Sequence, residues 1–486
     1  MASSIFPFLP LLLLAIWCGY AQSHEDGHIA AEISNKGLDF FKGLLIEKAE
    51  SSLVPLELPV IEKTVKIPVL GKVQMVLSDI TIEKIHTTSS VVKTGDSGIV
   101  IEVSGATANL SMNWKYSYTS AWLIPISVSD KGNATVQVEG LEVGLSLSLK
   151  TVEGSLKLSL LECGCYVNSI SIKLDGGASW LYQGLLDAFE GKIGSSVETA
   201  VSNKLKDAIV KLDSLLQSLP KEVPVTEIAT LNVTLVDDPD FSGSSVDLEI
   251  DGLISSKNEV FHATHNHILL QDSYACKEAD KMVRISLHED VLGSASSVYF
   301  EASKMRWMID KASDQTLMNT AGWRFIVPQL YKMYPNHDLN LNLSVSSNPT
   351  IKIKQQQIIA QIPLDVVIDV LDGEELVPVV CISTVIRASV SAEISQNAVS
   401  GVLKLMDLTM SLKWSNIGDL HMHLIQTIMS TTLKTVVVPY INLKLGKGFQ
   451  IPSFHGYKLQ DAQFICSDSW IVICSNVTPS QTFYHV

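Results

Sequence analysis

The sequence has little that would support enzyme chemistry. Its 486 residues contain no Gly-x-Ser-x-Gly nucleophile elbow, no phosphate-binding glycine loop and no dinucleotide-binding fingerprint. His288-Glu289 begins a metalloprotease pattern, but Leu292 occupies the position of its second histidine. A Ser/His/Asp triad that meets only in space leaves no such motif, so a lipid hydrolase remains an alternative. The motifs favour a protein that is not an enzyme and needs no cofactor.

A metal-binding pattern is also missing. His262, His265 and His267 lie close together, as do His421 and His423. Neither group has a cysteine or carboxylate at a recognised ligand spacing. Solvated histidines are the favoured interpretation, and we expect no metal site.

Charged residues are scarce, and the first half of the chain lacks arginine. Charged residues make up 18% of the sequence and apolar residues 46%, with a mean hydropathy of +0.24. Residues 22–250 hold 18 lysines, no arginine and 30 acidic residues, a net charge of −12, whereas residues 251–486 carry −3. This acidic balance argues against nucleic acid as a partner. The apolar surplus belongs either to a membrane span or to surface that lines a site for apolar ligands.

The one continuous apolar run at the N-terminus is too short to span a bilayer. It extends from Ile5 to Trp17, and Gly19 and Ala21 then occupy the −3 and −1 positions of a cleavage site. We predict a signal peptide over residues 1–21; a buried first helix is the alternative. The most apolar later stretch, Leu424 to Leu443, is interrupted by Lys434 and Pro439. We therefore expect a soluble mature protein that is secreted to the extracellular space.

Sequons and cysteines agree with secretion. The glycosylation candidates are Asn109, Asn133, Asn232, Asn342 and Asn476. Six cysteines remain after the signal, and all are disulfide candidates: Cys163, Cys165, Cys276, Cys381, Cys466 and Cys474. An even count favours structural disulfides, but six cysteines allow about fifteen connectivities and the sequence does not choose among them.

The order of predicted elements occurs twice along the chain. Helical periodicity over Ile29 to Glu50 is followed by alternating strands to Leu174 and a long helix from Trp180 to Leu219. The second half repeats this order with a helical pattern over Val283 to Phe300, strands from Leu339 to Trp414, and a helix from Asp419 to Leu443. Such a duplication predicts an α+β protein of two similar halves.

The helices carry more apolar surface than one face of a sheet needs. A twisted antiparallel sheet that curls around one long helix covers that helix only in part, which leaves elongated apolar clefts. The candidate pocket residues on the two N-terminal helices are Leu38, Phe41, Leu45, Leu185, Phe189 and Ile193. The competing interpretation is that these stripes belong to an ordinary core.

Several segments resemble a known family. They are Ile33-Ser34-Asn35-Lys36-Gly37-Leu38-Asp39-Phe40, Lys66 to Lys72, Gly401 to Leu405, Lys413 to Gly418, and Pro439 through Pro452. Together they resemble the bactericidal/permeability-increasing protein and lipopolysaccharide-binding protein (BPI/LBP) family, in order and over nearly the whole mature chain. Its plant members look most similar.

The resemblance implies an elongated, boomerang-shaped fold of the TULIP-like kind. Two barrel-like halves, each a twisted antiparallel sheet wrapped around a long helix, are joined by a central sheet. We expect a lipid-binding barrel over residues 22–228, a central-sheet strand and connector over 229–280, and a second barrel over 281–486. Each half would hold acyl chains in an apolar pocket.

The sequence departs from the family pattern in two places. Lys66, Lys72 and Lys115 match basic positions at the tip of the first half, but aromatic residues from Tyr116 to Trp122 replace the basic run that should follow. Trp114 and Trp122 therefore join the lysines as candidates for contact with a head group or membrane; ordinary strand aromatics are the alternative. Cys163 or Cys165 matches one partner of the family's disulfide, but the long helix has no cysteine to pair with it.

Three functions compete. The leading hypothesis is a secreted protein that holds acyl chains of phospholipid or bacterial lipopolysaccharide in innate immune defence. A general extracellular phospholipid carrier or transfer protein is the second, and a lipid hydrolase is the third. The first two imply phospholipid, lipopolysaccharide and a membrane or micelle surface as partners, whereas protein partners stay open.

Overall fold

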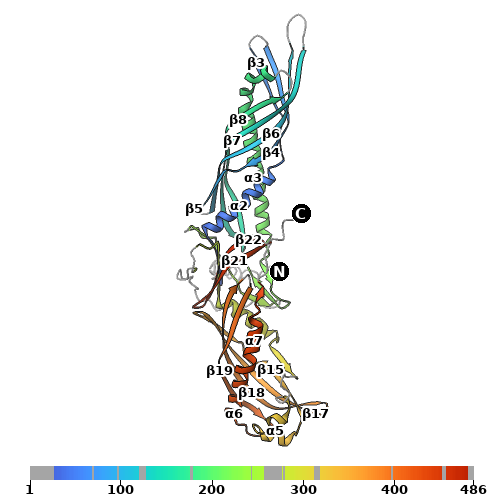
Figure 1. The fold of residues 1–486 in the computed structure, drawn as a ribbon, viewed down its shortest axis with the longest axis vertical. Helices are drawn as coiled ribbons and strands as arrows, with labels where there is room; N and C mark the ends of the chain where they lie inside the picture. The colour runs from blue at the N-terminus through green and yellow to red at the C-terminus, as the bar shows by residue number, and fades with distance from the viewer. Residues whose placement is uncertain are drawn as a thin grey trace, which may run out of the picture.

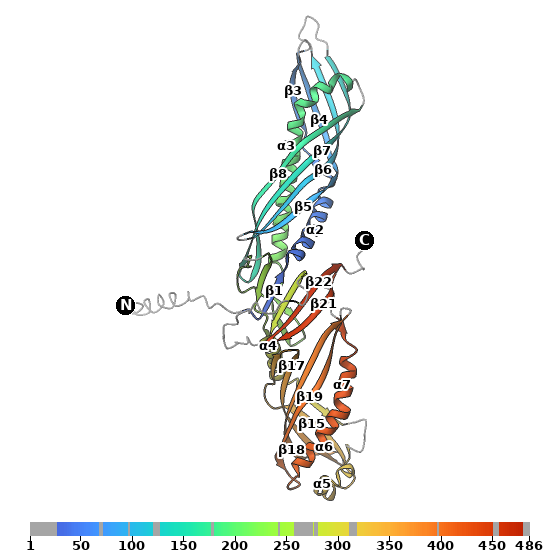
Figure 2. The same cartoon turned by 60° about the vertical axis from the view of Figure 1, so that its left-hand side comes forward.

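The computed structural model describes residues 27–67, 71–95, 98–119, 127–175, 179–241, 244–256, 276, 280–310, 318–395, 398–450 and 456–479. The predicted signal peptide, Trp122 and the histidines at 262, 265 and 267 lie outside these ranges. The molecule is elongated, with one half on either side of a small central sheet (Figures 1 and 2). This arrangement confirms the predicted α+β architecture of two sheet-and-helix halves.

The N-terminal half is a strongly twisted antiparallel sheet of seven strands. Its order is β2-β4-β6-β7-β8, with β3 paired to β4 and β5 paired to β6. The strands are β2 (Leu56–Leu58), β3 (Ile61–Ile67), β4 (Gly71–His86), β5 (Ser89–Gly95), β6 (Gly98–Thr119), β7 (Ser127–Val152) and β8 (Ser155–Asp175). Helix α3 (Ser179–Gln217) runs along the inner face, and α2 (Asn35–Ser52) lies beside it.

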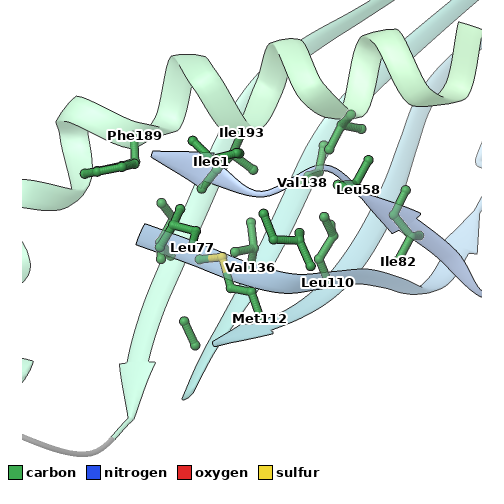
Figure 3. Close-up of a cluster of buried hydrophobic side chains, with 14 of the residues drawn as sticks. Leu58, Ile61, Leu77, Ile82, Leu110, Met112, Val136, Val138, Phe189 and Ile193 are labelled. Atoms are coloured by element: carbon green, nitrogen blue, oxygen red, sulfur yellow. The ribbon is translucent and has the colours of Figure 1, made fainter. Parts of the chain in front are cut away.

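Alternating side chains create the core of this half. Along β7, Ala134, Val136 and Val138 are buried while the residues between them are exposed. They pack with β4 and β6 residues and with Phe189 and Ile193 of α3 (Figure 3). This packed cluster fills the interior of the curled sheet at its tip, the end where β3 and β4 form a hairpin.

The central sheet joins the halves through their first strands. Its order is β11-β1-β13-β22-β21, formed by β11 (Val246–Ile250), β1 (Ile29–Ile33), β13 (Val283–His288), β22 (Trp470–Pro479) and β21 (Tyr457–Ser467). β1 and β13 pair antiparallel, and Glu32 and Arg284 lie opposite each other and form an ion pair. A short sheet of β9 (Glu222–Pro224), β10 (Ala229–Asn232) and β12 (Ile254–Ser256) lies beside this junction.

The predicted first helices of the two halves begin too early. Residues 29–33 and 283–288 are the strands β1 and β13, and the helices that follow are α2 and α4 (Glu289–Glu301). Ser34 and His288 mark the boundaries, since each caps its helix by accepting a hydrogen bond from a backbone N–H of the first turn. Pairing between distant strands overrides the apolar periodicity that both segments share with helices.

The C-terminal half repeats the sheet with its own long helix. Sheet order is β14-β15-β17-β18-β19-β20, with β16 paired to β17. The strands are β14 (Arg306–Ile309), β15 (Asp338–Val345), β16 (Thr350–Lys354), β17 (Gln357–Asp372), β18 (Glu375–Ser395), β19 (Ala398–Ser415) and β20 (Phe449–Gln450). The short α5 (Pro328–Met333) lies at the far end, and α6 (Met422–Thr432), the π-helical η3 (Leu433–Val437) and α7 (Val438–Leu445) form one continuous helical stretch along β19.

In the N-terminal half, the long helix covers the edge of the sheet with carboxylates. β8 is the last strand of the sheet, and α3 packs along it. Glu198 accepts a hydrogen bond from the backbone N–H of Val167 (2.9 Å), and Asp213 accepts one from Leu158 (2.8 Å). These bonds satisfy edge amides that have no neighbouring strand.

In the C-terminal half, side-chain amides of the long helix pair with backbone groups at the sheet edge. β20 covers β19 only at Ala398 and Val399. Further along β19, Asn442 of α7 accepts from the N–H of Leu403 (2.7 Å) and donates to its carbonyl oxygen (2.9 Å). Gln426 of α6 accepts from the N–H of Met410 (3.1 Å). Both halves therefore attach their long helix to a sheet edge through side chains.

The cysteines form fewer bridges than the even count favoured. Cys276 and Cys474 form a disulfide, whereas Cys163, Cys165, Cys381 and Cys466 are free thiols. The two thiols on β8 face α3, where helix residues Glu198 and Ser202 lie opposite them in place of a cysteine. Burial, together with the nearby Glu198 carboxylate and Cys163, raises the pKa of Cys165 to about 12.

Replacing Asn442 with alanine tests the edge attachment. The Asn442→Ala variant leaves the N–H and carbonyl of Leu403 without partners, so we expect the free energy of unfolding to fall by about 1–3 kcal/mol. Urea unfolding measures the loss, and hydrogen exchange should show faster exchange at Leu403. The amide of Met410, which Gln426 covers, should keep its protection; equal loss at both amides would contradict a local attachment.

Alkylation tests the cysteine assignment. In the native protein at mildly alkaline pH, Cys165 should react with iodoacetamide far more slowly than after unfolding, because its raised pKa keeps the thiol protonated. Glu198→Gln retains an oxygen for Val167 but removes the charge, so Cys165 should react faster in that variant. Peptide mapping should find Cys276 and Cys474 unmodified until reductant is added, and their alkylation without reductant would disprove the bridge.

Candidate functional site

An open apolar groove lies between the two helices of the N-terminal half and its sheet. Its volume is about 570 Å³, and its floor is formed by inward-facing residues of β6 and β7. Its apolar lining comprises Leu45, Ile46, Ala49, Leu53, Ile85, Ile101, Val103, Ala106, Leu141, Val143, Leu145, Leu147, Val201, Leu205, Ala208, Ile209, Leu212 and Leu215. A cavity of this size and character accommodates an apolar ligand.

Helical and strand periodicities produce this lining. Val201, Leu205, Ile209 and Leu212 recur every three or four residues on α3 and therefore share one face. On β7, Leu141, Val143 and Leu145 alternate with residues that point away from the groove. The groove lies where the apolar face of α3 and the inner face of the sheet do not contact each other.

Charged side chains are confined to the rim. Lys48 and Glu50 come from α2, and Lys204, Asp207 and Lys211 come from α3. Glu50 is held there, because it accepts a hydrogen bond from the backbone N–H of Thr87 (2.7 Å). The site thus has an apolar interior and a polar mouth, which is the arrangement an amphiphile requires.

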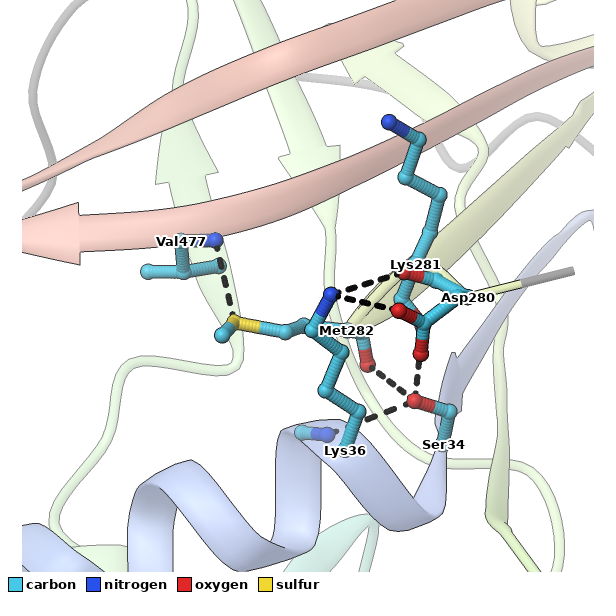
Figure 4. Close-up of polar contacts among 7 residues, drawn as sticks. Ser34, Lys36, Asp280, Lys281, Met282 and Val477 are labelled. Atoms are coloured by element: carbon cyan, nitrogen blue, oxygen red, sulfur yellow. Dashed lines mark hydrogen bonds and ion pairs between the residues drawn. The ribbon is translucent and has the colours of Figure 1, made fainter. Parts of the chain in front are cut away.

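Polar contacts to the other half hold the start of α2 in place. Ser34 donates to the carbonyl of Lys281 (2.7 Å), and Lys36 reaches both the carbonyl and carboxylate of Asp280 at 3.0 Å (Figure 4). A Cβ on Gly37 would lie 2.4 Å from the carbonyl oxygen of Met282, so only glycine permits this approach. These contacts fix the angle at which α2 leaves the central sheet and forms the groove wall.

The predicted pocket residues divide among three environments. Leu45 lines the groove, with 44% of its surface exposed. Leu38 is buried at the start of α2, and Phe41 is 38% exposed with its ring edge-on to Phe40. The structure does not describe the Leu185 side chain.

Phe189 and Ile193 belong to the packed cluster near the tip and not to the groove. They are almost fully buried and point toward the strands that carry Ile61 and Leu77 (Figure 3). The residues of α3 that do line the groove lie about two to six turns beyond Ile193, from Val201 to Leu215. The apolar stripe on α3 continued that far in the sequence, but the stripe alone did not distinguish core from groove.

Exposed lysines gather at the tip, far from the groove. Lys66 and Lys72 lie opposite each other across the β3–β4 hairpin, and Lys115 of β6 lies opposite Lys131 of β7. Sequence reasoning missed Lys131, which only the strand register identifies. From Ala106 in the groove to Lys115 is nine residues along β6, roughly 30 Å at the usual strand rise.

Trp114 does not fit its predicted role at a membrane. It is 1% exposed, its indole N–H donates to the carbonyl of Asn133 (3.0 Å), and its ring lies over Gly132, where a Cβ would approach it to 2.7 Å. Its neighbour Tyr116 stacks on it at a centroid distance of 6.3 Å. The indole is a core residue, because its inward position on β6 faces the sheet interior.

The remaining predicted sites have simple environments. Asn109, Asn133 and Asn342 are exposed on strands, whereas Asn232 and Asn476 are partly buried.

A second cavity of about 280 Å³ lies on the central sheet, lined by Glu32, Arg284 and several aspartates. Burial raises the pKa of Glu32 in spite of its ion pair with Arg284. Within the described ranges, no group of three or more histidine, cysteine or acidic side chains could hold a metal ion.

Comparison with known proteins places the chain in a family. Models of the LBP / BPI / CETP family match residues 37–219 with the N-terminal domain and residues 224–478 with the C-terminal domain. A BPI/LBP family protein of Arabidopsis thaliana is 50% identical over 472 residues, covering 97% of this chain and 96% of its own. Human lipopolysaccharide-binding protein is 22% identical over 488 residues, covering 96% of this chain and 98% of its own.

A solved structure agrees with the sequence matches. The crystal structure of lipopolysaccharide binding protein aligns with 94% of this chain and 100% of its own, at 20% identity and a TM-score of 0.61. That likeness extends over nearly the whole chain, as the two family matches together do. The chain belongs to the LBP / BPI / CETP family and has its lipid-binding fold.

Proposed function

We propose that this protein is secreted and holds the acyl chains of an amphiphile in the groove between α2, α3 and the sheet, without catalysing a reaction. The observation that carries the proposal is the groove itself, whose apolar interior opens at a charged rim. Burying acyl chains there would contribute about 0.8 kcal/mol per methylene. This interior also accounts for part of the apolar surplus in the composition.

The ligand we propose is a phospholipid or bacterial lipopolysaccharide, bound in the course of innate immune defence. Several full-length relatives are named for lipopolysaccharide binding, including the human one, and a rat relative is a bactericidal permeability-increasing protein, 24% identical over 489 residues. A predicted signal peptide and three exposed sequons support secretion and glycosylation.

The head group of a groove-bound lipid would lie at the rim, near Lys48, Lys204 and Lys211. The tip lysines lie too far along the sheet to contact the same head group, and packed core separates the two places. We therefore assign Lys66, Lys72 and Lys115 to a second contact, with the phosphates of lipopolysaccharide or of a micelle surface.

A lipid inventory tests the proposal directly. Protein purified from a eukaryotic host should release phospholipid that mass spectrometry identifies after extraction. Absence of any extractable lipid, together with failure to take up added phospholipid, would disprove it. Displacement from immobilised lipopolysaccharide by lipid A, but not by phospholipid, would separate a specific binder from a general carrier.

A bulky side chain placed in the groove should exclude lipid from it. Ala208→Trp places a large ring at the groove lining, so we expect several-fold less extractable lipid per protein with little change in unfolding. Val210→Trp is the matched control, because Val210 is on the same helix but 64% exposed and not part of the lining. Equal lipid loss in both variants would show that the groove is not the site.

Charge reversal at the tip should weaken binding to lipopolysaccharide micelles. Since each lysine near an anionic surface contributes about 1 kcal/mol, Lys66→Glu with Lys72→Glu should lower the affinity roughly tenfold or more, with a smaller effect at high salt. Lys157→Glu, at the other end of the sheet, is the control. Unchanged affinity in the double variant would remove the tip from the proposed site.

A further inference from the structure

The helical stretch of the C-terminal half is apolar but poorly covered. Met422–Leu445 is long and apolar enough to cross a membrane by composition, yet only 6% of its most apolar window is buried. Large side chains on its outer side are exposed, with Val436 at 58%, Tyr440 at 61% and Leu443 at 65%. Phe449, just after the helix, is 62% exposed. A soluble protein rarely exposes such a continuous apolar surface unless something covers it.

Three exposed threonines on this helix direct their hydroxyl groups toward the helix backbone. Thr427, Thr431 and Thr435 recur every four residues and are exposed. Each hydroxyl donates to the carbonyl four residues earlier, at 2.8–2.9 Å, so the methyl group is left to face outward. The surface is therefore less polar than its sequence indicates.

The stretch of sequence that holds the helix carries only positive charges. From Leu420 to Gln460 the sequence contains no aspartate or glutamate, although the whole chain carries a net charge of −15. Three exposed lysines, Lys434, Lys444 and Lys447, lie on the helix and just after it, and the fourth lysine of the segment, Lys458, lies on β21. Lys444 lies 5.7 Å from the centre of the Tyr440 ring. Cations and aromatic residues beside an apolar face are typical of helices that lie in a membrane interface.

We propose that this face of α6, η3 and α7 lies on the surface of a bilayer that contains anionic phospholipid. The helix does not cross the bilayer, because Asn442 and Gln426 fix its opposite side to β19. Tyr440, Leu443 and Phe449 enter the interface, and the lysines contact lipid phosphates.

Docking in this way would bring lipid to the groove. In both overall views, α2 and α7 lie on the same side of the molecule (Figures 1 and 2). A bilayer held against α7 would thus lie on the side of the molecule that carries α2, which forms one wall of the groove. This role rests on the proposed lipid binding, although the docking can be measured without it.

Vesicle flotation of the full-length protein tests docking. Wild-type protein should float with vesicles of phosphatidylcholine mixed with phosphatidylglycerol and much less with phosphatidylcholine alone. Tyr440→Ser with Leu443→Ser should reduce binding more than about tenfold, since each side chain would lose apolar contact with the bilayer. Val210→Ser on α3, equally exposed, is the control and should bind like wild type. Equal binding by wild type and the double variant would overturn the proposal.

Two further measurements keep docking distinct from folding and from groove binding. The double variant should carry the same extractable phospholipid as wild type, which shows an intact fold and groove. Leu443→Trp should show additional fluorescence quenching by brominated lipids in the mixed vesicles, and its absence would contradict insertion. If purified protein carried no lipid but still floated, the groove proposal would fail and docking would stand.

Discussion

The structure depends on how a curled sheet closes its free edge. The outer strand β8 and the part of β19 that β20 leaves uncovered present backbone amides without a neighbouring strand. Leaving such groups unpaired is costly in a protein interior. Carboxylates on α3 and amides on α6 and α7 supply the missing partners. Because each helix is attached along one side only, its other side is left for the groove in the N-terminal half and for an exposed apolar face in the C-terminal half.

Much of this architecture could be predicted from the sequence. Alternation in β7 and the four-residue stripe on α3 depend on neighbours along the chain, and both are present in the structure. The repeated order of elements and the scattered segments of resemblance predicted two similar halves, which the family matches and the LBP structure confirm. The position of the groove along the α3 stripe could not be predicted from the sequence. Phe189, in the packed cluster, and Val201, in the groove, are both apolar residues of the same four-residue repeat.

The missing information lies in contacts between distant residues. Whether Phe189 meets core or groove depends on where α2 lies, and α2 is positioned by Ser34 and Gly37 against Lys281 and Met282, nearly 250 residues away. The segment around Ser34 carried the family resemblance, and the structure explains its residues as a junction. Trp114 was misassigned for the same reason, since its burial depends on Gly132 in the opposite strand.

The pairing of β1 with β13 has a consequence for how the two halves can be separated. Each strand begins its own half, yet each covers an edge of the other. A half expressed alone would leave one side of its first strand unpaired along the whole length of that strand. Such an edge is prone to self-association. The two halves therefore share one sheet, and we expect a half expressed alone to self-associate along its uncovered strand unless another strand covers it.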